Sequence, residues 1–553
     1  MVTQQQPGAN ATKGAGIVLL TLASGQFLMT LDSSVMNVSI ATVASDLGTT
    51  VTGIQTAITL YTLVMATLML TGGKIGAIIG RRRAFSLGCM IYGAGSLTTA
   101  LAPNLGVLFF GWSLLEGIGA ALIMPAIVAL VSGNFAPERR TSAYGLIAAA
   151  GGIAVAVGPL IGGAVTTFVS WRLVFVGEVV VVITLLVLAR RVQDVPPTER
   201  HSLDFVGSLL SILGLGLAVF GVLRSSVWGW ITPKQGAPAI FGLSLVVWLI
   251  LAGLLFVWGL FAWESRLERQ AKEPLFRPSM FRNRQLVGGL TMFLFQYFIQ
   301  AGIFFTIPLF LSVVLELSAL QTGVRLVPLS LGLLVSALAV PRLWPKASPR
   351  RVVRVGLVLL LAATVLLIAL LDADATASVV TIPLLIVGIG IGALASQLGA
   401  VTVSAVPDEE SPEVGGLQNT ALNLGASLGT ALVGSVLIAT LTTLALQGVL
   451  ANPNIPDSLK SQAQTTFGAG VPFVSDTAIR TALQAQGASA ATIQAVLEVN
   501  ANGRLQALRT ALFVVVLVAA LSLLFTRRIP TRPPGAPAKI PDEETSDIGG
   551  QPE

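Results

Sequence analysis

The chain has 553 residues, of which 54% are hydrophobic and only 11% are charged. Soluble domains carry about 25% charged residues, so this composition excludes an ordinary soluble protein and indicates a polytopic membrane protein. A single cysteine and a single histidine exclude a disulfide framework, a soft-ligand metal site and a Ser-His-Asp triad, and the net charge of +7 is spread over short loops instead of forming one patch for nucleic acid.

Apolar windows long enough to cross a bilayer recur along the whole chain. About 20 helical residues, at about 1.5 Å each, cross the ~30 Å hydrocarbon core. A short tail, residues 1–15, comes first and lacks the cleavage site of a signal peptide. We then expect fourteen spans, with approximate limits 16–40, 52–72, 84–102, 105–131, 141–165, 171–190, 204–224, 238–262, 286–314, 322–342, 353–371, 379–404, 416–446 and 507–526.

The first span carries an acid, Asp32, near its middle. An ionisable group at this depth is costly and is usually functional. On a helix Met29, Asp32 and Met36 share one face, and a carboxylate between two polarisable thioethers suits an organic cation. We therefore expect these residues to bind substrate and protons. The alternative is that Asp32 only ties the first span to a neighbouring helix.

Two more acids lie inside apolar spans. Glu116 is about eleven residues into the fourth span, so at about 1.5 Å per residue it lies near the depth of Asp32. A contact with lipid or with a neighbouring helix is the alternative for Glu116. Glu178 in the sixth span is a weaker candidate, because it could reach the outer interface instead.

The fifth span has a proline among glycines, in the stretch 151–163. Pro159 removes one backbone hydrogen bond and bends the helix, and the glycines let a neighbouring helix approach closely. The pattern predicts a helix about which two bundles can pivot, although static packing would also explain it.

Polar groups mark the end of the chain. Asn419, Asn423, Ser427 and Thr430 form a stripe on the thirteenth span at helical spacing, suited to line a cavity or to bond a neighbouring helix. Residues 447–506 are polar with helix-like stretches, and we expect an outer lid or hairpin, or else an insertion without function. The tail 527–553 is rich in proline, glycine and acid, which predicts disorder.

Most of the 33 lysine and arginine residues fall on one side if the N-terminus is inside. An excess of these residues marks the cytoplasmic side. We therefore expect a multi-pass protein of the cell inner (plasma) membrane with both termini in the cytoplasm.

The chain also repeats itself. The segment 117–145 is echoed by 390–415, and the loop 79–83 by 348–352, at nearly the same offset. This predicts an all-α protein of two six-helix bundles, 16–190 and 286–526, with two linker helices inserted at 204–262. Parallel halves around a midplane site are the architecture of a rocker-type transporter.

These motifs resemble the major facilitator superfamily, in particular its fourteen-helix drug:proton antiporter branch of the multidrug and quaternary-ammonium efflux type. The likeness covers about residues 16–526. The first-span stretch LDSSVMNVSI is similar to the signature of that branch, with matches at Asp32, Val35, Asn37 and Val38, and we expect Asn37 to bind substrate or protons as well. The fifth-span stretch is similar to the antiporter motif, with matches at Gly151, Gly158, Pro159, Gly162 and Gly163. The fold implied is the major facilitator fold.

Two departures from the family pattern bear on coupling. The loop after the second span matches the conformational motif of the family at Gly73, Gly80, Arg81 and Arg82. Ala77 and Ile78 stand where the family has the acid of an inner latch and its arginine. In the fourth span Ser113 replaces the arginine linked to proton coupling.

We expect Glu116 to take over the role of that arginine. In the family the first and fourth helices line the cavity, so Asp32 and Glu116 should face each other across it. Burial and mutual repulsion would keep these carboxyl groups protonated until a cation arrives.

Together these features predict a secondary active exporter, a proton-coupled antiporter of amphipathic, cationic small molecules that works by alternating access. No phosphate-binding loop of the ATPase type occurs, so the energy must come from a gradient. We expect no enzyme, no cofactor and no metal, and a monomer whose partners are its substrate, protons and the bilayer but not nucleic acid. A lipid or metabolite exporter, an uncoupled facilitator, and a non-transporting scaffold or sensor remain as alternatives.

Overall fold

The computed structural model describes residues 11–135, 137–194, 202–234, 236–372, 375–407, 410–466 and 471–531. The first ten residues, the single histidine and the tail beyond residue 531 lie outside them. Within these ranges thirteen helical segments are long and apolar enough to cross a membrane. The remaining expected span is α3, a 20-residue helix whose first turn of arginines lowers its hydropathy. The all-α polytopic fold is therefore confirmed.

The first six spans form one bundle. Two of its helices begin at capped turns, because the side chains of Thr50 and Asn104 accept hydrogen bonds from backbone amides three residues on. The fourth span is composite, with a π-helical segment, η1, between two α-helical parts. The elements are α1 (Ala11–Asp46), α2 (Val51–Ile79), α3 (Arg81–Ala100), α4 (Leu105–Leu108), η1 (Phe109–Glu116), α5 (Gly117–Asn134), α6 (Pro137–Phe168) and α7 (Arg172–Ala189).

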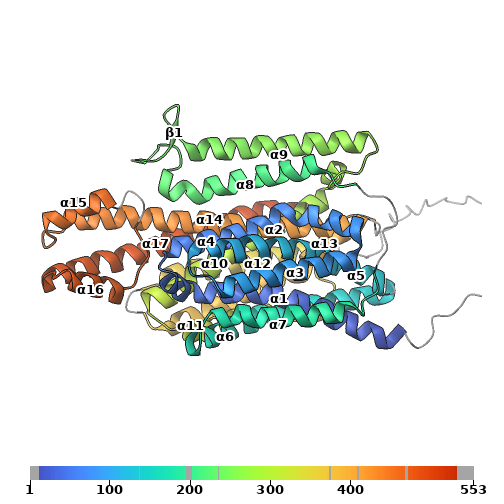
Figure 1. Cartoon of the computed structure of the whole chain (residues 1–553), viewed down its shortest axis with the longest axis horizontal. Coiled ribbons are helices and arrows are strands. Elements are labelled where there is room, and N and C mark those ends of the chain that lie inside the picture. Colours follow the sequence, from blue (N-terminus) through green and yellow to red (C-terminus); the bar gives the residue numbers. More distant parts are fainter. Residues whose placement is uncertain are drawn as a thin grey trace, which may run out of the picture.

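Two inserted helices, α8 (Phe205–Trp228) and α9 (Leu245–Arg269), form a separate layer that stands beside the bundles in Figure 1. α8 packs on α2 and α14, whereas α9 packs mainly on α8 and exposes apolar side chains such as Leu255 and Trp258. The expected start of this second helix, at 238, is wrong. A two-stranded hairpin, β1 (Ala239–Ile240) and β2 (Leu243–Ser244), comes first, and Ser244 then caps α9.

The remaining spans form the second bundle. Its elements are η2 (Pro278–Arg282), α10 (Arg284–Leu309), η3 (Phe310–Val314), α11 (Ala319–Leu343), α12 (Pro349–Leu370), η4 (Ala377–Val380), α13 (Thr381–Val403), α14 (Ser411–Ala451), α17 (Ala490–Phe525) and η7 (Thr526–Arg528). α11 packs against α13, and α10 packs against α14 and α17.

The two bundles meet along two helix pairs, α2 with α14 and α6 with α11. The second pair is a close crossing. A Cβ on Gly163 would meet the backbone of Ala319, and a Cβ on Gly323 would meet the backbone of Pro159. Side chains would separate the helices here, so glycine at both positions brings the two halves into backbone contact.

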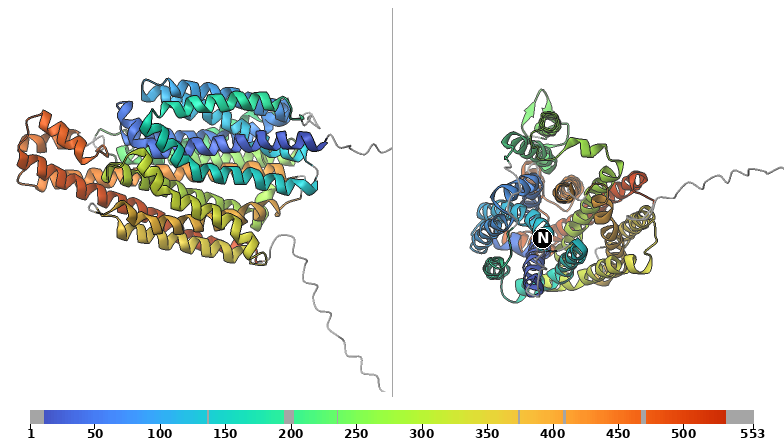
Figure 2. Two further views of the ribbon diagram at one scale, coloured as in Figure 1. Left: turned by 90° about the horizontal axis from the view of Figure 1, so that it is seen from below. Right: turned by 90° about the vertical axis from the view of Figure 1, so that its right-hand side faces the viewer.

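At one end of the molecule the chain builds a helical hairpin outside the bundles, drawn in orange and red in Figures 1 and 2. It consists of α15 (Asp457–Thr466), α16 (Asp476–Ala485) and the adjoining ends of α14 and α17. We call this the hairpin end, and the opposite end, where α1 begins and α17 finishes, the tail end. The last helix begins at Ala490, so the expected limits of the last span, 507–526, were too short.

Candidate functional site

Three acids from three helices meet inside the first bundle. Asp32 lies in α1, Glu116 ends η1, and Glu178 lies in α7. A carboxylate oxygen of each lies within 4.8 Å of the others. The side chains are 1%, 0% and 2% exposed. None of the ion pairs in the described part of the chain includes any of them. We call these three residues the acid cluster.

Asp32 is held by an aromatic donor. The indole nitrogen of Trp112 donates to its Oδ1 at 2.9 Å and to its Oδ2 at 3.1 Å. The Trp112 ring in turn stacks on Tyr61 of α2, with ring centroids 5.0 Å apart and planes within 7°. This pair fixes the carboxyl group of Asp32 between α1, α2 and η1.

The two glutamates are held by hydroxyl groups of α3. Ser96 and Tyr92 donate to Oε2 of Glu178 at 3.0 and 3.3 Å, and Thr99 lies 3.3 Å from Oε1 of Glu116. Oε2 of Glu116 and Oε1 of Glu178 are buried without a hydrogen-bond partner. A buried polar oxygen without a partner is costly, so these two atoms are suited to a proton or a small cation.

The chemistry of the acid cluster follows from its spacing. Negative charges this close repel strongly in a medium of low dielectric constant, and no basic side chain of the described residues pairs with them. The three groups therefore cannot all be ionised, and neighbouring carboxyl groups share protons, as in paired catalytic carboxylates. Three carboxylates could also hold a hard cation, for which oxygen ligands are preferred.

The π-helical segment η1 carries two side chains of the site, Trp112 and Glu116, and sets the direction in which they point. Trp112 and Glu116 both come from η1 and are buried. Ser113, between them, donates to the carbonyl of Ala57 at 2.9 Å and so ties η1 to α2. Wider helical turns of this kind occur mostly as short insertions, frequently at functional sites.

The arrangement differs in one respect from the expected one. Asp32 and Glu116 do come together, but within the packed first bundle instead of across a gap between the bundles. Glu178 joins them because α7 packs on α3, and it does not reach the interface. The sequence contained one unused signal: Tyr92, Ser96 and Thr99 share a face of the third span.

The other predicted binding residues do not hydrogen-bond to the acid cluster. Met29 and Met36 are buried in the apolar core. Asn37, Asn419 and Asn423 each donate to a backbone carbonyl four residues earlier in their own helix, at 2.7, 2.9 and 2.9 Å. Farther along α14, Ser427 donates to the backbone of α2.

A cleft of about 470 Å³ opens at the hairpin end, where α1 faces the connection between η3 and α11. Val38, Thr42 and Asp46 line it on one side and Ser312 and Ser318 on the other. Val38 is six residues from the acid of α1, which is about 9 Å along the helix. The cleft thus lies between the two bundles, on the hairpin-end side of the acid cluster.

Two glycines of the fifth-span motif pack against the segment of α1 that follows Asp32. A Cβ on Gly158 would meet Ser34 at 2.6 Å, and one on Gly162 would meet Val35 at 2.7 Å. Gly151 lies farther along α6, opposite Gln26 of α1. α6, the helix that carries Pro159, therefore contacts both α11 and α1, the helix of Asp32.

The loop between α2 and α3 is closed at the tail end. Gly80 has a positive φ of 101°, and Arg81 donates to the carbonyl of Gly73 at 2.8 Å. The backbone amide of Arg82 donates to Asp194 at 2.9 Å. Asp194, just beyond α7, was not predicted, and it supplies a carboxylate to a loop that has Ala77 at the acidic position of the motif.

Comparison with known proteins agrees with this architecture. The family model described as Major Facilitator Superfamily matches residues 22–206 and 202–430. The puromycin resistance protein of Streptomyces alboniger is 32% identical over 76% of this chain and 81% of its own length. The tetracenomycin C resistance and export protein of Streptomyces glaucescens is 28% identical over 92% of this chain and 91% of its own.

Solved structures resemble the chain in fold. A crystal structure of a POT peptide transporter in complex with sulfate has a TM-score of 0.56 at 14% identity, over 93% of this chain and 96% of that one. An inward-facing, occupied bacterial homologue of the lysosomal transporter Spinster has a TM-score of 0.55 at 16% identity, over 95% and 98%.

Proposed function

Because the chain belongs to the major facilitator superfamily, we propose that it is a secondary exporter that exchanges amphipathic small molecules for protons by alternating access. Two relatives whose names refer to antibiotic resistance or export cover more than three quarters of the chain, which supports export over uptake. The close crossing of α6 and α11 supplies a contact about which the two bundles can rock.

The observation that carries the proposal is the acid cluster. Its three carboxyl groups are buried within 4.8 Å of one another and have no basic partner among the described residues. Such a group holds protons when it is closed to water and releases them when it opens or when a cation approaches. In this account Asp32 is the group for which substrate and proton compete, and Glu116 and Glu178 store further protons.

The cationic character of the substrate rests on the surroundings of Asp32. The carboxyl group lies beside the stacked rings of Trp112 and Tyr61, and aromatic rings and a carboxylate both attract organic cations. The substrate would leave through the cleft lined by Val38 and Ser318. We place the tail end in the cytoplasm, because it carries the arginines of the α2–α3 and α12 loops.

The test is efflux of a fluorescent organic cation from everted vesicles, with and without a pH gradient. Asp32→Asn and Glu116→Gln should abolish the part of the flux that the gradient drives. Glu498→Gln, an exposed acid outside the acid cluster, is the matched control and should leave the flux unchanged. Gradient-driven flux that persists in both cluster variants, with normal amounts of protein in the membrane, would refute proton coupling through these acids.

A further inference from the structure

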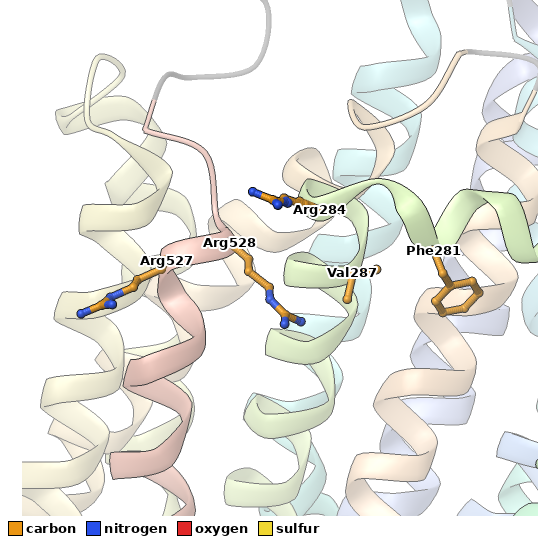
Figure 3. Close-up of a pocket in the computed structure, with 5 residues that line it drawn as sticks. All are labelled: Phe281, Arg284, Val287, Arg527 and Arg528. Carbon is orange, nitrogen blue, oxygen red and sulfur yellow. The ribbon is translucent and has the colours of Figure 1, made fainter. Parts of the chain in front are cut away.

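A second cavity lies at the tail end, between the start of α10 and the end of α17. Its volume is about 510 Å³, and its lining is Phe281, Arg284, Val287, Arg527 and Arg528. Figure 3 shows Arg284 extending from α10 towards η7, and Arg528 extending from η7 towards α10. Arg527 leaves the same turn on the other side. We call this cavity the arginine pocket.

The arginines of this pocket have no acidic partner. Arg284, Arg527 and Arg528 take part in none of the ion pairs of the described residues. Two neighbouring arginines behave differently. Arg350 donates to the carbonyls of Ile529 and Arg527, and Arg354 donates to Thr526. Those two side chains fasten the end of α17 to α12. Arg528 lies over the ring of Phe525, 5.6 Å from its centroid, and within the described residues no carboxylate pairs with the three arginines of the pocket.

The helix dipole of α10 adds to this positive charge. α10 is 26 residues long and begins at Arg284 on the wall of the pocket. The side chain of Asn283 already accepts hydrogen bonds from the amides of Gln285 and Leu286. The N-terminus of a helix carries about half a positive charge, which favours an anion close to it.

The position of the pocket along α17 indicates where such an anion comes from. Leu517, Leu521 and Leu524 are 54%, 46% and 67% exposed. Leu517, Leu521, Leu524 and Arg528 follow one another at spacings of four, three and four residues. The three leucines share one face of α17, and Arg528 follows in the short 3-10 turn η7. An exposed leucine stripe on a membrane helix faces acyl chains, so the arginine that ends it lies at the level of the lipid headgroups.

We propose that the arginine pocket binds the phosphate of an anionic phospholipid from the leaflet at the tail end, with the acyl chains along the leucine stripe. Arg284 and Arg528 grip the phosphate from opposite walls, since the planar guanidinium matches phosphate oxygens with paired hydrogen bonds. Phe281 and Val287 contact the apolar part of the lipid. The lipid thus links the first helix of the second bundle to the last.

The experiment is a titration of the purified full-length protein with phosphatidylglycerol, in nanodiscs of phosphatidylcholine, with bound lipid counted by native mass spectrometry. The parent should retain phosphatidylglycerol in preference to phosphatidylcholine. Arg284→Gln and Arg528→Gln should each weaken retention about tenfold, as expected for one charge-assisted contact of about 1.4 kcal/mol. Lys346→Gln, an exposed cation at the same end but outside the pocket, should have no effect.

Three outcomes would overturn the proposal. Equal retention of the two lipids would exclude a headgroup site. An equal loss in Lys346→Gln would mean that general surface charge attracts the lipid. Displacement of the lipid by an excess of inorganic phosphate, with phosphate retained in its place, would identify a site for a free anion. Thermal melting of each variant in phosphatidylcholine alone separates loss of the site from loss of the fold.

Discussion

Trp112 and Asp32 are joined by a forked hydrogen bond, in which one indole nitrogen serves both carboxylate oxygens, at 2.9 and 3.1 Å. The donor belongs to η1, the segment that also carries Glu116. A change in the charge of Asp32 therefore acts directly on η1, the segment that carries Glu116. We therefore expect the protonation of Asp32 and the position of Glu116 to be coupled through Trp112.

Removing this donor should make Asp32 harder to ionise. Trp112→Phe keeps an aromatic ring to stack on Tyr61 but loses the N–H group, so the pH at which the proposed proton-driven efflux is half-maximal should rise. Everted-vesicle efflux over a range of pH measures the change. Trp230→Phe, an exposed tryptophan elsewhere, should leave the profile in place, and an unshifted profile in Trp112→Phe would show that the hydrogen bond does not govern release.

The crossing of α6 and α11 should not accept a methyl group. In Gly323→Ala the new Cβ would press on the backbone of Pro159, so we expect a loss of about 1–3 kcal/mol in stability, as for other overpacked sites, and slower transport. Melting of the detergent-solubilised protein together with efflux checks this. Gly399→Ala, where a Cβ meets open space, is the control. Equal melting temperatures for the two variants would contradict the close contact.

Asp194 should stabilise the loop at the tail end. Its carboxylate accepts the Arg82 amide at the start of α3, so Asp194→Ala should cost about 1 kcal/mol, as loss of a helix cap does. Asp457→Ala, whose side chain is almost fully exposed, should cost little. The measurement is hydrogen exchange of the first turn of α3, which should become faster only in the first variant.

Docking of the hairpin onto the second bundle should depend on pH. Burial alone would raise the pKa of Glu316, but hydrogen bonds from the amide and hydroxyl of Thr477 outweigh it and hold that pKa below its ordinary value of 4.5. A lowered pKa in the docked state means that the ionised group favours docking. This contribution is present in full above the ordinary value and is lost as the pH falls through the lowered pKa.

The contact is accessible to a distance measurement. Fluorescent labels on α16 and on the start of α11, which belongs to the second bundle, should separate on acidification in the parent. In Glu316→Gln, which keeps an acceptor without the charge, the separation should not change over this range. Identical curves for the two proteins would rule out Glu316 as the titrating group.

The sequence predicted how deep the buried acids lie in the membrane, but not the direction in which the side chains of the spans point. Counting residues placed Asp32 and Glu116 at one level, and the structure brings them together. The rotation of α7 about its axis depends on packing against α3, so the approach of Glu178 could not be read from its position in the chain. For the same reason Met29 and Met36 share a helical face with Asp32 and yet are buried in the apolar core.

The predicted helix ends are wrong where a helical segment is polar or where an apolar segment is not helical. The segment from Ala490 is polar, so its helix-like residues were assigned to the outer hairpin, and its continuity with the last span could not be predicted from apolar windows. The reverse holds before α9. There the apolar residue Ile240 ends strand β1, and Phe241 and Gly242 form the turn to β2, with φ values of 51° and 75°. Apolar character was mistaken there for helix.

The length of α14 gives the hairpin a mechanical consequence. Forty-one residues make a rod of about 60 Å, roughly twice the hydrocarbon thickness, so its far part is a lever arm beyond the bilayer. α17 packs on α14, and Arg504 in α17 pairs with Asp476 of α16, so α16 is held to this arm through α17. Any tilt of the second bundle therefore displaces the tip of the hairpin further than it displaces the helices within the membrane. A probe attached at the tip would report the tilt of each transport cycle without disturbing the membrane helices.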